Sequence, residues 1–273
     1  RIVPIYYLLI VVFCIANYFL SDTGSRLFIN PIAPQWYVAF LQNFQMSLQG
    51  KFGPEALTPT WSLAVEEQFY LIIPLVIYFF NDKKVLLFCL MCVVFAPIYR
   101  ANSDNWYQSY THFLSRIDSP CFGVMLAIFT KNKEFAAEIR KYAVYILLIL
   151  VCMIVAFVFF GFKSLNHSLI ALIFMFVTAV TIRLREGQML YKLLASKFLQ
   201  LMGRYSYFIY LYHILINGLL FLLLTRYTNA TIENVYGYLI TILSFIATCL
   251  LAHFSYYLIE SRMISWSHRF KYV

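Results

Sequence analysis

Charged residues are scarce in this 273-residue chain: they make up 12% of the sequence, whereas 62% of the residues are hydrophobic. A soluble domain carries roughly 25% charged residues. The composition therefore excludes a soluble domain and favours one compact transmembrane domain over residues 1–273. The net charge of +9 does not indicate a nucleic-acid partner, because the basic residues lie mainly in the loops between apolar segments.

The common motifs of soluble enzymes are also missing. The sequence has no P-loop, no dinucleotide-binding fingerprint, no HExxH zinc motif and no Ser-His-Asp pattern. Cys89 and Cys92 form a CxxC, but it lies within an apolar run and has no second pair. We interpret the cysteines as small apolar helix residues and expect neither a metal site nor a bound cofactor.

Apolar windows of about 20 residues predict the membrane spans. Most Lys and Arg residues then fall on one side, which the positive-inside rule assigns to the cytoplasm together with both ends of the chain. Arg100 is among the few cations expected outside. The expected fold is an all-α, polytopic transmembrane helical bundle of about eight spans, at residues 2–20, 62–80, 84–99, 119–130, 142–162, 167–182, 205–224 and 236–258.

The longest external loop covers residues 21–60 and is punctuated by prolines. Within it, the sequence WYVAFLQNF at residues 36–44 is apolar enough to lie in the membrane surface. We therefore expect an interfacial or re-entrant helix in this loop.

Two adjacent carboxylates, Glu66 and Glu67, lie near the start of the predicted span 62–80. An ionised carboxylate near the centre of a bilayer costs about 2.5–3.5 kcal/mol, so such residues mark functional sites by default. On a helix, Glu66 shares a face with Ser62 and Tyr70, and Glu67 does not. One carboxylate is expected to face a polar interior; the alternative is that both lie in the wet external interface.

A polar stripe follows one face of the apolar helix predicted at 205–224. It consists of Ser206, Tyr210, His213 and Asn217 at positions i, i+4, i+7 and i+11. The stripe indicates either the polar lining of a functional interior or hydrogen bonds between helices.

Two further places carry ionisable groups. Arg116 and Asp118 lie at the mouth of the short span 119–130, where an ion pair or a helix cap is the alternative to a functional role. Glu260 lies on one face with His253 close to the cytoplasm, where it is either functional or a wet interfacial charge next to Arg262.

The run from Thr60 to Leu71, TWSLAVEEQFYL, closely resembles the signature of the membrane acyltransferase-3 family, which includes O-antigen and peptidoglycan O-acetyltransferases. Pro74 fits the Pro-containing span that follows this signature. Weaker matches to the family occur at Arg1 to Pro4, at Arg116 to Asp118 followed by Gly123, at Gly203 to His213, and at Glu260.

The resemblance implies an acyltransferase for groups other than aminoacyl groups. It would move an acyl group, most often acetyl, from a cytoplasmic donor such as acetyl-CoA to a hydroxyl of an extracytoplasmic glycan or lipid-linked sugar. The location would be a bacterial inner membrane. Family members usually have more spans, and their first pair carries an R-x₁₀-H motif with the catalytic His. That motif has no counterpart here, so we expect an N-terminally truncated chain that is inactive alone.

The site roles follow from the same resemblance. Glu66 and Glu67 would support catalysis, Arg1 and Arg204 would hold the donor, and acyl-CoA would be a co-substrate. A non-enzymatic transporter or polysaccharide-export component is the alternative, and it predicts inverted repeats. The expected acceptor-binding residues are Trp61, Ser62, Tyr70, Arg116, Asp118, Ser206, Tyr210, His213 and Glu260.

Overall fold

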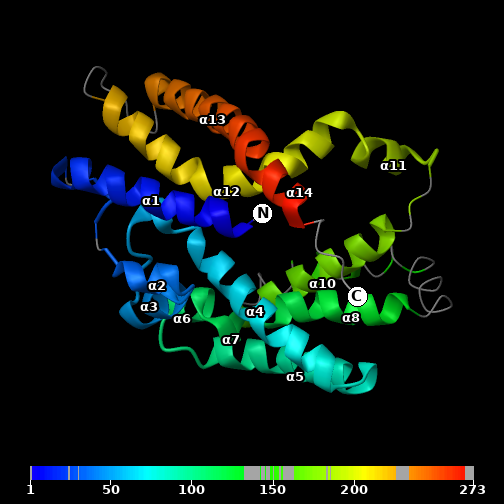
Figure 1. Cartoon of the computed structure of the whole chain (residues 1–273). Helices are drawn as coiled ribbons and strands as arrows, with labels where there is room; N and C mark the ends of the chain where they lie inside the picture. Colours follow the sequence, from blue (N-terminus) through cyan, green and yellow to red (C-terminus); the bar gives the residue numbers. More distant parts are fainter. Residues whose placement is uncertain are drawn as a thin grey trace. The chain divides into compact units, whose positions relative to one another are not determined.

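The computed structural model describes the chain except residues 1, 24, 30, 132–141, 143–144, 146–147, 150, 154, 156–162, 183, 185, 226–233 and 268–273. All regular elements in this described part are helices (Figure 1). Contacts between residues divide the chain into two compact units. Unit 1 comprises Arg1–Ala39, Phe52–Thr60 and Leu194–Val273, and unit 2 comprises Phe40–Lys51 and Trp61–Leu193.

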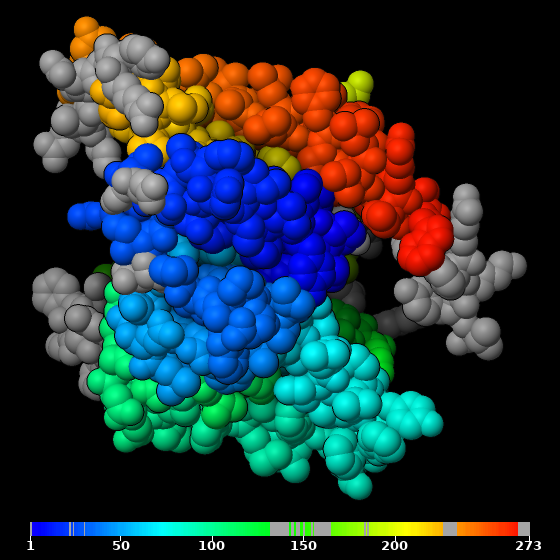
Figure 2. All heavy atoms as spheres, turned by 60° about the vertical axis from the view of Figure 1, so that its left-hand side comes forward, coloured from blue at the N-terminus to red at the C-terminus, as the bar shows by residue number. Residues whose placement is uncertain are grey.

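Unit 1 is built on three long apolar helices: α1 (Ile2–Leu20), α12 (Lys197–Leu224) and α13 (Val235–Ser255). Helices α12 and α13 lie side by side, and α1 packs against α12 (Figure 1). Figure 2 shows α1, in dark blue, against the C-terminal helices in orange and red. The short elements are η1 (Ser21–Thr23), α2 (Pro34–Val38), η2 (Glu55–Leu57), the π-helical turn η3 (Tyr256–Glu260) and α14 (Ser261–Ser267).

In its described residues, unit 2 contains four apolar helices: α4 (Thr60–Phe79), α5 (Asp82–Ala101), α8 (Asp118–Thr130) and α10 (Lys163–Thr181). Helix α8 lies beside both α5 and α10. Buried apolar side chains, mainly from α4, α5 and α8, form a core cluster in this unit. The short helices are α3 (Gln42–Gln49), α6 (Trp106–Thr111), α7 (Phe113–Arg116) and α11 (Met189–Leu194).

The lengths of the helices show which of the predicted spans could cross a membrane. Among the described residues, five helical segments are long and apolar enough to cross a membrane, and Asp118–Thr130 and Leu165–Thr181 are apolar but shorter. The all-α bundle is therefore confirmed, and the chain is a multi-pass membrane protein. The expected span 142–162 falls mostly outside the described residues. The five long segments are Ile2–Leu20, Glu55–Phe79, Asp82–Ala101, Lys197–Leu224 and Val235–Trp266.

One prediction in the external loop needs correction: residues 36–44 do not form one helix. Helix α2 ends at Val38 and α3 begins at Gln42. Between them Phe40 adopts a φ of 55°, in the left-handed region that residues other than Gly rarely occupy. The Gln68 side chain of α4 donates to the Phe40 carbonyl at 2.7 Å, which holds the chain in this conformation.

Candidate functional site

A cavity of about 460 Å³ lies in unit 2 beside the first turns of α4. Ser62, Glu66 and Tyr70 line it because residues four apart share one helix face. Glu66 is exposed on its wall, whereas Glu67 is partly buried and is not among the lining residues. Five predicted site residues therefore meet at one cavity, whose lining is Trp61, Ser62, Val65, Glu66, Tyr70, Arg116, Ser119 and Pro120.

Arg116, the last residue of α7, is held among aromatic rings. Its guanidinium carbon lies 4.5 Å from the centre of the Tyr110 ring and 5.3 Å from that of Trp61. Its Nε donates to the Tyr110 carbonyl at 2.7 Å, and Trp106 stacks on Tyr110 at 4.6 Å. Burial lowers the pKa of Arg116 to about 10, so the side chain stays charged at neutral pH.

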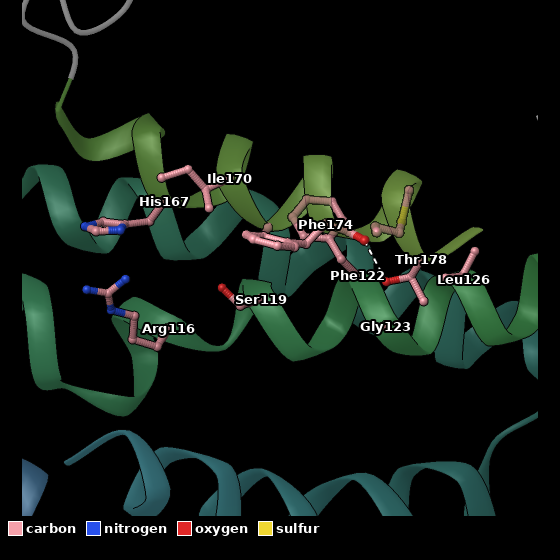
Figure 3. A pocket seen from close by; sticks show the side chains of 11 residues that line it. Arg116, Ser119, Phe122, Gly123, Leu126, His167, Ile170, Phe174 and Thr178 are labelled. Carbon is pink, nitrogen blue, oxygen red and sulfur yellow. Dashed lines mark hydrogen bonds between the residues drawn. The ribbon is translucent and has the colours of Figure 1, made fainter. Parts of the chain in front are cut away.

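A second cavity, of about 380 Å³, lies between α8 and α10. Arg116 and Ser119 line both cavities. Figure 3 shows the side chains of Arg116 and His167 facing each other at one end, with Phe122 and Phe174 further along. The polar groups are thus gathered where α7 leads into α8.

Asp118 has a different environment from Arg116. Its carboxylate pairs with Arg100 of α5 at 3.0 Å, and both side chains are fully buried. Arg100 also donates to the Ser115 carbonyl, and Ser168 donates to Asp118. The pair joins α5, α7, α8 and α10, and Asp118 lines neither cavity. Arg100, expected in an external segment, lies in the last turn of α5 and is buried against this carboxylate.

The predicted residues of α12 lie in unit 1. Ser206 is exposed and its hydroxyl donates to the Gly203 carbonyl at 3.0 Å. The Tyr210 hydroxyl donates to the Pro59 carbonyl at 3.1 Å. Arg204 is exposed. Ser206 and Tyr210 therefore satisfy backbone carbonyls of the same unit.

His213 and Asn217 share a cavity of about 170 Å³ between α12 and α13. The His213 Nδ1 lies 2.8 Å from the Tyr210 carbonyl and 3.1 Å from that of Ile209. A carbonyl only accepts hydrogen bonds, so Nδ1 carries the proton and Nε2 is the acceptor in the neutral ring. Asn217 accepts a hydrogen bond from Ser244 of α13 at 2.8 Å. The polar stripe thus combines a cavity lining with an interhelical bond.

Glu260 lies in the π-helical turn at the end of α13. It is fully buried, so its interpretation as a wet interfacial charge is wrong. Neighbouring His253 is exposed, and its Nδ1 lies 2.7 Å from the Tyr205 hydroxyl. The proposed donor ligand Arg1 falls outside the described residues.

Several residues around the two cavities had no predicted role. Ser119 follows the matched Arg116 to Asp118 element directly. Trp106 and Tyr110 are four apart, a spacing that stacks aromatic rings on a helix and was a usable signal. His167 had no such signal, because α10 brings it to the cavity only through the tertiary fold.

The chain is similar in sequence to known acyltransferases. A family model described as an acyltransferase domain matches residues 1–254. The chain is 28% identical over 243 residues to proteins named O-acetyltransferase OatA from Staphylococcus aureus strains NCTC 8325 / PS 47, COL and MRSA252. Each match covers 83% of this chain and 38% of the relative, so the chain spans well under half of these relatives. No solved structure gives a significant match.

Proposed function

Because this chain belongs to the acyltransferase-3 family of membrane proteins, we propose that it transfers an acetyl group from a cytoplasmic donor, acetyl-CoA, to a hydroxyl of an extracytoplasmic glycan or lipid-linked sugar. The observation that carries the proposal is the cavity with Glu66 on its wall. A carboxylate within an apolar helix needs a partner, a hydrated space or a substrate to offset its lost hydration, and this cavity provides the space.

The chemistry is acyl transfer between a thioester and an alcohol. The acceptor oxygen bonds to the acetyl carbonyl carbon, the carbon–sulfur bond breaks, and the hydroxyl proton ends on the departing thiolate. Glu66 accepts a hydrogen bond from an acceptor hydroxyl and so orients its oxygen. Trp61 and Tyr70 contribute aromatic side chains to the cavity wall, against which the apolar face of a sugar would pack, and Ser62 adds a hydroxyl.

We expect the variant Glu66→Gln to lose about tenfold or more of the transfer activity, because the amide is a weaker acceptor and carries no charge. The protein is expressed from its own gene in its own host, and alkali-released acetate from surface glycan is compared with the protein level in membranes.

The matched control is Glu186→Gln, the same change at an exposed position that lines none of the described cavities. This control should retain the acetyl content of the wild type. Wild-type acetylation in Glu66→Gln at equal protein level would remove Glu66 from the mechanism. If deletion of the gene leaves the acetyl ester content of the surface glycan unchanged, the proposed function itself is rejected.

A further inference from the structure

Arg116 is a largely buried cation that has no carboxylate partner within the described part of the chain. The ion pairs there join Arg100 to Asp118 and Lys131 to Asp82. The Arg116 Nη2 is buried and makes no hydrogen bond. Ring faces attract a cation, but they accept no hydrogen bond in the plane of the guanidinium. The planar fork of Arg116 therefore lacks the acceptor that matches it.

The Arg116 side chain lies where a ligand could reach it, on the wall of two cavities. Arg116 and Ser119 form part of the wall of both unit 2 cavities, and His167 faces Arg116 at the end of the second (Figure 3). A guanidinium matches the two oxygens of a carboxylate or a phosphoryl group bidentately. The Ser119 hydroxyl and the His167 imidazole line the same cavity as Arg116 and are further hydrogen-bonding groups. The site therefore has the chemistry of an anion pocket.

Glu66 lines the first cavity together with Arg116, and this limits the ligand further. A simple anion would be repelled by the carboxylate, and a neutral sugar would leave the guanidinium unpaired. A ligand with hydroxyls at one end and a negative charge at the other satisfies both groups.

We propose that the acceptor is an anionic sugar whose carboxylate or phosphoryl group binds Arg116 while a hydroxyl faces Glu66. This inference rests on the proposed function and names its substrate class. The anionic group belongs either to an acidic sugar or to the phosphate of a lipid-linked sugar, and the shared chemistry is a planar or trigonal set of anionic oxygens.

The test is calorimetric titration of the detergent-purified protein with glucose, glucuronate and glucose 1-phosphate. At least one anion should bind about tenfold more tightly than glucose, which corresponds to about 1.4 kcal/mol. Preference for glucuronate indicates an acidic sugar, and preference for glucose 1-phosphate indicates a lipid-linked phosphate. Equal binding of all three compounds would overturn the proposal.

Two variants assign the preference to Arg116. Arg116→Gln should bind the anions no better than glucose, and Arg116→Lys should fall in between because a point charge replaces the fork. Lys131→Gln removes the same charge at an exposed position and should keep the preference. An anion preference retained in Arg116→Gln would contradict the proposal.

If Arg116→Gln does not purify as a folded protein, the titrations of the wild type are repeated at increasing ionic strength. The preference for the anions over glucose should fall as the ionic strength rises. A preference that does not depend on salt would reject an ionic contact. Failure of these titrations leaves the Glu66 experiment untouched, so a wrong substrate class can be distinguished from a wrong function.

Discussion

Replacing Arg100 with alanine is expected to lower the free energy of unfolding by about 3–5 kcal/mol, because it leaves the Asp118 carboxylate buried without its cation. Both side chains are fully buried, and Arg100 also donates to Ser115 and Ser168. Asp118→Ala should cost a similar amount, because Arg100 is then the uncompensated charge. The measurement is unfolding of the detergent-solubilised protein, followed by its helical signal.

A double-mutant cycle gives the coupling between the two groups. The variant carrying both alanines should be destabilised by less than the sum of the single variants, because neither charge is then left alone. The exposed pair of Lys131 and Asp82 is the control: its atoms are 2.7 Å apart, closer than the buried pair, yet Lys131→Ala should cost about 1 kcal/mol or less. Additive effects at Arg100 and Asp118 would contradict this interpretation.

The second large effect is expected at Gln68, which joins α4 to the start of α3. Its Nε2 donates to the Phe40 carbonyl and to Asn43 Oδ1, at 2.7 and 2.8 Å. Each buried group left without a partner costs about 1–3 kcal/mol, so Gln68→Ala should lower the free energy of unfolding by about 2–4 kcal/mol. The change should appear first as faster amide exchange in α3.

Gln68→Glu makes the test sharper, because a carboxylate oxygen would then lie against the Phe40 carbonyl and neither atom could donate. This variant should be at least as unstable as Gln68→Ala. The control is Gln49→Ala, which removes an exposed bond to Gln45 and should change stability by no more than about 0.5 kcal/mol. Unchanged amide exchange in α3 of the Gln68 variants would show that this contact does not hold the loop.

The long helices were predictable because the evidence for each one lies within its own stretch of sequence. A run of apolar residues long enough to cross a bilayer defines α1, α4, α5, α12 and α13 without knowledge of their neighbours. The same holds for the cavity face of α4, since helical spacing alone places Ser62, Glu66 and Tyr70 together.

The partners of buried polar groups were not predictable, because they depend on contacts between distant segments. Arg100 sits at the polar end of an apolar run, where a sequence alone indicates a loop cation, and its carboxylate comes from another helix. Gln68 lies within the recognised TWSLAVEEQFYL run, but nothing in that run reveals a partner at Phe40. The break between α2 and α3 went unpredicted for the same reason.

Helix α8 has 13 residues, so at 1.5 Å per residue it extends about 20 Å. The hydrocarbon layer of a bilayer is about 30 Å thick, and a helix this short is accommodated by local thinning of the membrane or by water reaching one of its ends. The hydrocarbon layer beside α8 would therefore be about 10 Å thinner than elsewhere. Arg116, the last residue of α7, and Ser119 lie at the N-terminal end of this short helix.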